Sequence, residues 1–402
     1  MRIAYILLDP GIGIFGTKGA SVHAQEVIRA FRRLGHEVTV FCTRTDDAMP
    51  RDLADLEVVR LDLPPGLDRG CREIALLRVS DLLADLVATR GGFDLVYERY
   101  SLFSTAGAAL SDRLGVPLIL EVNAPLIEEQ RTHRGLVHTE HAQRSTAASF
   151  GRAARIVCVS EAVAGWLRRD YPGLAEVVVV PNGVNTDRIA PGSTDRNAPE
   201  TPDPTVRDAS PTVHGTVPSA PAPVRIGFVG TLKPWHGTDR LLAACADLEG
   251  PFHLDIVGHG PEAEALAAQA ERLRLGARIT FHGAVAPADV PAYLQRFDIA
   301  VAPYPAGPNY FSPLKIYEYL AAGVPTVASR VGSIPELLAG TDAGILVAPD
   351  DTAELTAALQ TLLNDPARRT RMGQAARAEA IARHSWESRC RDILAPVLVE
   401  TA

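Results

Sequence analysis

The chain has 402 residues, of which 47% are apolar and 22% charged, and a formal net charge of -8. Because a single core stops growing at about 250 to 300 residues, this length predicts two domains. The acidic balance excludes a general electrostatic attraction to nucleic acid. The five cysteines are odd in number and far apart in the chain, which favours a reducing, cytoplasmic compartment over a disulfide framework.

Short runs of Val, Ile and Leu alternate with amphipathic stretches over residues 1–188, beginning with RIAYILL at 2–8. This alternation is typical of βαβ units and predicts a doubly wound α/β domain with a parallel sheet. The first run has the length of a strand and no small-residue cleavage site after it, so we interpret it as a strand and not as a signal peptide. No stretch reaches the roughly 20 apolar residues that a membrane-spanning helix needs.

The glycines of GIGIFG at residues 11–16 have the spacing of a dinucleotide-binding fingerprint. In a dehydrogenase the helix would begin near the second or third glycine, whereas here the helical pattern starts only after Ser21, its expected N-cap. A dehydrogenase is therefore disfavoured, and a plain flexible turn is the alternative. We interpret the loop as one whose backbone approaches a ligand at Gly13 and Gly16, with His23 beside it.

Polar residues at the ends of later strands are candidates for a second ligand. Glu98 ends the run FDLVYE, Asn123 follows VPLILEV, and His138 belongs to a stretch with three histidines that we expect to be a mobile helix. The histidine spacings lack a supporting ligand pattern, so no metal site is predicted.

Residues 189–223 change completely in composition, being rich in Pro, Ser, Thr and Asp. Such a segment buries too little apolar area to offset its ordering entropy, which predicts an extended or disordered linker. A segment that binds a partner is the alternative. The strand and helix alternation then restarts, and residues 224–384 are predicted to form a second doubly wound domain, with a cleft between the carboxyl ends of the two sheets.

The most informative segment is YFSPLKIYEYLAAGVPTVA at residues 310–328. Ser312 is the expected N-cap of a helix, with Pro313 and Leu314 in its first turn, and the free amide groups of such a helix N-terminus suit a phosphate. Lys315 adds a charge in the first turn. Glu318 lies one turn further on the same face, where a carboxylate accepts hydrogen bonds from a ribose diol.

A second loop, GTLKPWHG at residues 230–237, follows the strand VRIGFV and is expected at the same edge of the sheet. It carries Gly230, Thr231, Lys233 and His236. A packed loop with a solvated lysine is the alternative interpretation of these residues.

Four segments together resemble glycosyltransferase family 4, a retaining family with the GT-B fold of two Rossmann-like domains facing a central cleft. They are GASVH, the stretch from VSEAV to PNGVNTDRIAP, VGTLKPWHG, and SPLKIYEYLAAGVPTVAS. The resemblance implies that the second domain holds a nucleotide-diphosphate sugar and that the acceptor lies against the first. It also implies that residues 385–402 form a helix that returns to the first domain.

In that family the second Glu of a Glu-x7-Glu motif binds the nucleotide ribose, and Glu318 occupies its position, while Tyr310 replaces the first Glu. Thr231 and His236 stand where the family has an Arg and a Lys for the diphosphate. The candidate catalytic residues are Lys315, Lys233 and His236, and the two lysines are expected to supply the positive charge for the diphosphate. The expected donor-binding residues are Gly13, Gly16, Gly230, Thr231, Tyr310, Ser312, Pro313, Leu314 and Glu318. The expected acceptor-binding residues are His23, Glu98, Asn123 and His138.

The resulting hypothesis is a retaining glycosyltransferase that acts on a small-molecule or carbohydrate acceptor. No Asp-x-Asp motif is present to hold a divalent ion, so we expect a metal-independent reaction without a cofactor, its positive charge supplied by protein groups. A nucleotide-sugar epimerase of the same fold and a non-catalytic sugar-nucleotide-binding protein remain alternatives. Peripheral membrane contact through a lipid acceptor also stays open, as do the base, the sugar and the acceptor.

Overall fold

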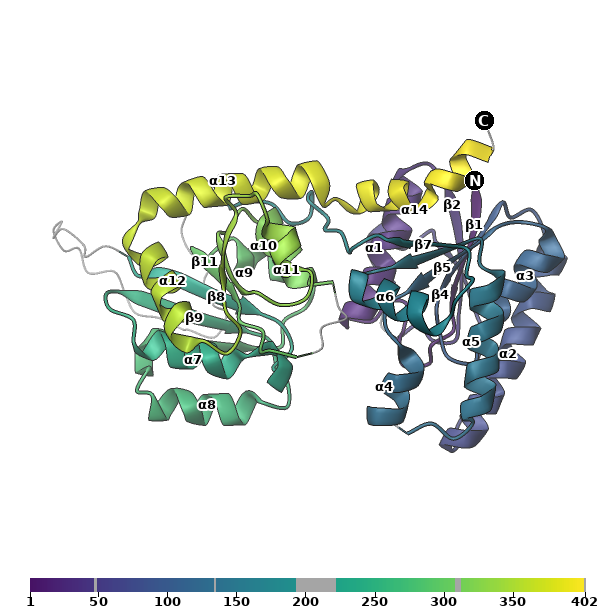
Figure 1. The fold of residues 1–402 in the computed structure, drawn as a ribbon, viewed down its shortest axis with the longest axis horizontal. Coiled ribbons are helices and arrows are strands. Elements are labelled where there is room, and N and C mark those ends of the chain that lie inside the picture. Colours follow the sequence, from purple (N-terminus) through teal and green to yellow (C-terminus); the bar gives the residue numbers. More distant parts are fainter. Residues whose placement is uncertain (47–48, 134, 193–221, 308–311, 401–402) are drawn as a thin grey trace, which may run out of the picture.

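The computed structural model describes residues 1–46, 49–133, 135–192, 222–307 and 312–400. The chain forms two α/β units that lie side by side (Figure 1). The expected linker at 189–223 falls mostly outside the described residues and stays a prediction, as does the placing of Tyr310. No helix in the described ranges is both long enough and apolar enough to cross a membrane.

The N-terminal unit is built on a parallel sheet of seven strands in the order β3-β2-β1-β4-β5-β6-β7. Ile3 of β1 pairs with Val38 of β2 on one side and with Leu95 of β4 on the other, so the strand order reverses between β1 and β4. The strands are β1 (Arg2–Leu7), β2 (Glu37–Cys42), β3 (Glu57–Arg60), β4 (Leu95–Arg99), β5 (Leu118–Val122), β6 (Arg155–Cys158) and β7 (Glu176–Val179).

The C-terminal unit repeats this plan with six parallel strands in the order β10-β9-β8-β11-β12-β13. Its strand order reverses between β8 and β11, the kind of crevice where open α/β sheets bind ligands. The strands are β8 (Val224–Val229), β9 (Phe252–Val257), β10 (Ile279–Gly283), β11 (Ile299–Ala302), β12 (Thr326–Ser329) and β13 (Gly344–Val347). These two sheets confirm the predicted fold class.

Helices cover both faces of each sheet, as the continuous apolar runs require. Ile3 and Tyr5 of β1 pack with α1, whereas Ala4 and Ile6 pack with the helices on the opposite face. In the N-terminal unit these elements are α1 (Gly19–Arg33), the 3-10 helix η1 (Arg51–Leu53), α2 (Arg69–Arg90), α3 (Ala106–Leu114), α4 (Leu126–His133), α5 (Thr139–Arg152) and α6 (Glu161–Asp170).

In the C-terminal unit, Phe228 of β8 packs with α7, α8 and α12, and Val229 faces the opposite layer around α10. The elements after β8 are the 3-10 helix η2 (Pro234–His236), α7 (Thr238–Ala246), α8 (Ala263–Arg272), the 3-10 helix η3 (Gly276–Arg278), α9 (Val290–Leu294), α10 (Leu314–Ala321), α11 (Ile334–Leu338), α12 (Thr352–Asn364), α13 (Pro366–Arg383) and α14 (Trp386–Glu400).

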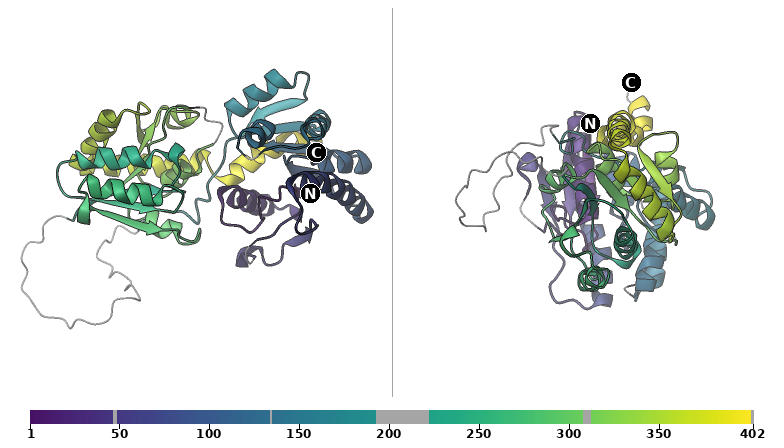
Figure 2. Two further views of the ribbon diagram at one scale, coloured as in Figure 1. Left: turned by 90° about the horizontal axis from the view of Figure 1, so that it is seen from below. Right: turned by 90° about the vertical axis from the view of Figure 1, so that its left-hand side faces the viewer.

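The chain crosses between the units twice, and the two crossings lie together. Val184, on the outgoing segment after β7, accepts a hydrogen bond from the Trp386 amide at 3.3 Å and donates to the carbonyl of His384 at 2.8 Å. Beyond this point α14 packs on α1, with Trp386 and Cys390 buried in the core of the N-terminal unit. Figures 1 and 2 show α13 and α14 passing from one unit to the other.

Two helix starts differ from expectation. α1 begins at Gly19 with Lys18 at the N-cap position, so Ser21 is not a cap and is instead buried within the helix. The stretch around His138 is not one mobile helix, because α4 ends at His133 and His138 occupies the N-cap position of α5.

Candidate donor cleft

A cleft of about 520 Å³ lies between the two units. Its C-terminal wall comes from the loops after the parallel strands β8 to β11 and from the start of α10, the edge where such sheets bind ligands. The facing wall comes from Thr17, Lys18, Gly19 and Val22 at the start of α1, and Arg188 completes it from the connecting segment. The cleft gathers Gly230, Thr231, His236, Ser312, Pro313, Leu314, Lys315 and Glu318, all of which the sequence singled out.

Lys315 is the central charged group of the cleft. Its side chain is buried, and its ammonium nitrogen has no hydrogen-bond partner in the described part of the chain. Nζ lies 4.3 Å from the centre of the Phe228 ring and 4.8 Å from that of Tyr304. Burial lowers the pKa of Lys315 to about 7. A buried, unpartnered cation that lines a cleft is suited to an anionic ligand.

The N-terminus of α10 lies beside this lysine, because Lys315 is in its first turn. Pro313, not Ser312, occupies the N-cap position, and no side chain caps the helix. The hydroxyl of Ser312 instead accepts a hydrogen bond from the Asn182 amide at 3.0 Å, while Asn182 Nδ2 donates to the Ser312 carbonyl at 3.1 Å. The prediction that Ser312 caps this helix is therefore wrong. Ser312 binds the connecting segment instead, and the first amides of α10 have no side-chain acceptor.

Glu318 is half-buried on the same wall of the cleft, one turn after Lys315. Burial raises the pKa of its carboxyl group to about 7, and the nearby charge of Glu26 acts in the same direction, against Arg188 and Lys315. The carboxylate is thus placed to accept hydrogen bonds from a polar ligand that also meets Lys315.

The loop after β8 approaches Lys315 closely. Gly230 has a φ of +152°, and a Cβ added there would lie 3.2 Å from Lys315 Nζ. The Nδ1 atom of His236 contacts the carbonyl of Thr231, which only accepts, so Nδ1 carries the proton and Nε2 is left as an acceptor. Burial and the Lys315 charge lower the pKa of His236 to about 4, so this ring is neutral near pH 7.

Three of the expected site residues, Lys233, Gly13 and Gly16, do not line the cleft. The Lys233 ammonium lies 4.6 Å from the centre of the exposed Trp235 ring, and the residue is absent from the cleft lining. Gly13 and Gly16 pack on Asp46: an added Cβ would lie 2.1 Å from its carboxylate at Gly13 and 2.9 Å at Gly16. Residues 17–19 of the same loop, and not these glycines, line the cleft.

Two of the expected acceptor residues, His23 and Asn123, contact the buried carboxylate of Glu121 in the N-terminal unit. His23 Nε2 lies 2.9 Å from Glu121 Oε1, and Asn123 donates to the same oxygen at 2.5 Å, as does Arg99 at 2.6 Å. Burial alone would raise the pKa of Glu121, but His23 and Arg99 hold it well below its ordinary value. Glu98 is buried nearby and accepts from the Gly107 amide at 3.0 Å. Glu121 and its three partners form an internal network, and neither they nor Glu98 line the cleft between the two units.

A separate cavity of about 590 Å³ opens at the carboxyl edge of the N-terminal sheet. Arg44, Arg69 and Arg72 line it together with Glu73, whose carboxylate also accepts from the His138 amide at 2.7 Å. Sequence reasoning missed these arginines. Their signal was the position of Arg69 and Arg72 in the first turn of a helix that follows the Asp68 N-cap.

Comparisons with known proteins place the chain in a family. Residues 17–188 match the family described as Glycosyltransferase Family 4, and residues 223–365 match Glycosyl transferases group 1. A D-inositol 3-phosphate glycosyltransferase of Kineococcus radiotolerans is 31% identical over 93% of this chain and 88% of its own length. A protein of the same name from Segniliparus rotundus is 28% identical over 96% and 85% of the two chains.

Solved structures share the fold over the whole chain. Sucrose-phosphate synthase from Thermosynechococcus elongatus superposes with a TM-score of 0.74 at 22% identity and covers 100% of both chains. Anabaena HepE in complex with UDP and glucose gives a TM-score of 0.70 at 19% identity with the same coverage. The matches favour sugar transfer over the epimerase, binding-protein and dehydrogenase hypotheses. The chain belongs to glycosyltransferase family 4 and is a glycosyltransferase.

Proposed function

We propose that this glycosyltransferase takes a sugar from a nucleotide-diphosphate donor held in the cleft and transfers it, with retention, to a hydroxyl group of an acceptor held by the N-terminal unit. The observation that carries the proposal is the buried ammonium of Lys315, which faces the cleft without a hydrogen-bond partner in the described ranges. A diphosphate supplies the partner that this cation lacks.

Breaking the bond between the sugar and the diphosphate builds negative charge on the leaving oxygens. Lys315 and the first turn of α10 line the cleft, so a diphosphate bound there would have fixed positive charge and free amide groups beside it, which would stabilise the charge without rearrangement. We propose that these protein groups replace a divalent ion. Because the His236 ring is neutral, we propose that its Nε2 atom accepts a hydrogen bond from a hydroxyl group of the nucleotide sugar.

Glu318 is proposed to bind the ribose, because its carboxylate lies on the same helix face as Lys315 and lines the same cleft. One HepE structure is a complex with UDP, and another is a complex with UDP-glucose. Uridine diphosphate is therefore the first nucleotide to test here.

The acceptor is proposed to occupy the cavity at the carboxyl edge of the N-terminal sheet. Its three arginines suit an acceptor with an anionic group. The relatives from Kineococcus radiotolerans and Segniliparus rotundus are named for D-inositol 3-phosphate, a polyol that carries such a group. For a retaining transfer, the acceptor hydroxyl attacks on the face from which the leaving group departs, and the departing phosphate takes its proton.

Incubation with UDP-, GDP- and ADP-sugars and a set of polyol phosphates, followed by mass spectrometry and NMR of the product anomer, tests the proposal. Formation of a glycoside with the donor's anomeric configuration is expected. An inverted product would overturn retention. Absence of both transfer and nucleotide binding across the panel would overturn the donor site itself.

A further inference from the structure

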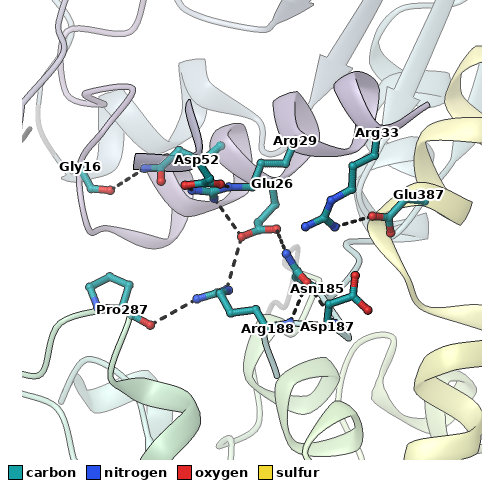
Figure 3. Close-up of polar contacts among 11 residues, drawn as sticks. Gly16, Glu26, Arg29, Arg33, Asp52, Asn185, Asp187, Arg188, Pro287 and Glu387 are labelled. Atoms are coloured by element: carbon teal, nitrogen blue, oxygen red, sulfur yellow. Dashed lines mark hydrogen bonds and ion pairs between the residues drawn. The ribbon is translucent and has the colours of Figure 1, made fainter. Parts of the chain in front are cut away.

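A charged cluster joins the start of the chain to the segment that connects the two units. Glu26 of α1 lies at its centre, with Arg29 of the same helix on one side and Asn185 and Arg188 of the connecting segment on the other (Figure 3). None of these four residues was singled out by the sequence.

The carboxylate of Glu26 is 3% exposed and is held by three donors. Asn185 Nδ2 donates to Oε2 at 3.2 Å, while Arg29 Nη1 and Arg188 Nη2 lie 3.1 and 3.4 Å from Oε1. A buried carboxylate is costly unless it is paired in this way, so loss of one partner leaves a charge that the others must compensate. The contact fixes the connecting segment against α1.

Arg188 extends this contact to the C-terminal unit. Its Nη1 donates to the carbonyl of Pro287, in the loop after β10, at 3.3 Å. Its Nε is buried and makes no hydrogen bond within the described residues. The same side chain lines the donor cleft together with Glu318. One guanidinium therefore touches both units and borders the ligand cleft.

The charge of Arg188 acts on two carboxylates that belong to different units. It pairs with Glu26, and it is the first of the attractive charges that oppose the rise in the pKa of Glu318, whereas Glu26 itself promotes that rise. The other titratable residues that line the cleft are Lys18, His236, His259, Tyr304 and Lys315. Among these, Lys315 is the one that also favours the charged form of Glu318.

We propose that Arg188 is a positioning residue of the donor site: its guanidinium bridges Glu26 and Pro287 across the two units and lines the same cleft as Glu318, so that ribose binding and the placing of the units depend on one side chain. This inference rests on the proposed function, because it requires a nucleotide in the cleft. Arg188 touches no reacting atom.

Two substitutions separate the charge of Arg188 from its bridging contacts. Arg188→Met removes both and keeps only an unbranched apolar stem. Arg188→Lys keeps the charge, but a single ammonium lacks the planar fork that reaches Glu26 and Pro287 together. We therefore expect the lysine variant to retain the electrostatic effect on Glu318 and to lose the bridge.

The experiment is calorimetric binding between about pH 5 and pH 9. The probes are inorganic pyrophosphate and whichever of UDP, GDP and ADP binds the unmodified protein. Nucleoside diphosphate binding should weaken at low pH as Glu318 becomes protonated, and we call this part of the pH profile the acidic limb. Arg188→Met should move the acidic limb up by roughly one pH unit and weaken binding about fivefold at pH 7. Pyrophosphate has no ribose to contact Glu318, so the loss of Arg188 should not shift the pH profile of its binding. Arg188→Lys should leave the limb in place and weaken nucleoside diphosphate binding at every pH.

Arg29→Met is the matched control, since Arg29 pairs with the same Glu26 and borders no part of the donor cleft. It should leave the acidic limb where it is. The inference fails if Arg188→Met has the pH profile of the unmodified protein, or if Arg29→Met shifts the acidic limb by the same amount. It also fails if Arg188→Lys binds the nucleoside diphosphate as tightly as the unmodified protein does. If Arg188→Met does not fold, the affinity of Arg188→Lys for the nucleoside diphosphate alone tests whether the bridging contacts matter. Failure of the unmodified protein to bind any nucleoside diphosphate would instead count against the proposed function.

Discussion

The ammonium group of Lys315 lies 4.3 Å from the centre of the Phe228 ring, inside the cleft between the two units. The ring face attracts the cation but supplies no hydrogen bond, so the charge keeps much of its desolvation cost. Lys315 is thus the group on which the proposed diphosphate site is most directly tested.

Replacement of Lys315 by Met should separate activity from stability. Loss of the cation at the leaving group should lower kcat about 100-fold. The free energy of unfolding should rise by about 1 kcal/mol, because a buried unpaired charge is replaced by an apolar side chain of similar length. Steady-state kinetics and urea unfolding measure the two effects. A variant that loses stability and keeps its activity would contradict this role.

Lys233→Met tests the sequence-based expectation that both lysines serve the diphosphate. Since the Lys233 ammonium lies over the exposed ring of Trp235, its loss should change kcat far less than the loss of Lys315. Equal losses in the two variants would mean that the loop after β8 moves when the donor binds.

Diphosphate binding should take up a proton above pH 7. The pKa of Lys315 is lowered to about 7, so the group is mostly neutral at pH 8, and a bound anion favours its charged form. Titration with pyrophosphate at pH 8 in buffers of different ionisation enthalpy should report this proton, and Lys315→Met should abolish it. Pyrophosphate affinity should fall as the pH rises through 7.

The same lysine has a signed effect on stability. Its folded-state pKa is about 7 against an ordinary value of 10.5, so the unfolded chain binds more protons between these values. This group therefore makes the protein more stable as the pH rises from 7 towards 10.5. Comparison of urea unfolding at pH 7 and at pH 9 in the unmodified protein and in Lys315→Met isolates the contribution, which should vanish in the variant.

Glu318→Gln should weaken nucleoside diphosphate binding and leave pyrophosphate binding intact. The amide keeps the size of the side chain but removes the charge that a ribose diol favours, at a cost of about 1.5 to 3 kcal/mol for a hydrogen bond to a charged group. Competition binding with both probes is the measurement. A parallel loss of pyrophosphate binding would place Glu318 in the diphosphate site.

The sheets and the cleft between the two units could be predicted because their signals are local. Short apolar runs define the strands, and the carboxyl ends of parallel strands meet at one edge, which brings the loop after β8 to the start of α10. Lys315 and Glu318 could be placed together for the same reason, as neighbours on one helix face.

The remaining site residues depend on contacts between distant segments, which no local pattern encodes. Ser312 has the sequence signature of a cap, but Asn182 occupies its hydroxyl. His23 follows a glycine loop, yet in the interior it pairs with Glu121 of β5. Nothing in the sequence around Arg188 indicates that it pairs with Glu26 of α1, which lies far away in the chain.

Ser312→Ala should destabilise the protein, because the buried Asn182 amide loses its acceptor. The expected cost is about 1 to 3 kcal/mol in the free energy of unfolding. Ser333 is a matched control: it occupies the N-cap position of α11 and makes no capping hydrogen bond, so Ser333→Ala should cost much less. Equal costs would show that the Ser312 contact contributes nothing.

Trp386 should account for much of the stability that α14 brings to the N-terminal unit. Its side chain is 4% exposed, packs with α1, and lies edge-on to the His23 ring at a centroid distance of 5.0 Å. Truncation leaves a large cavity, so Trp386→Ala should cost about 3 to 5 kcal/mol. Trp235, which is 56% exposed, provides the control, and its replacement by Ala should cost far less in the same urea titration. If both variants unfold at the same urea concentration, the return of the chain to α1 does not stabilise this unit.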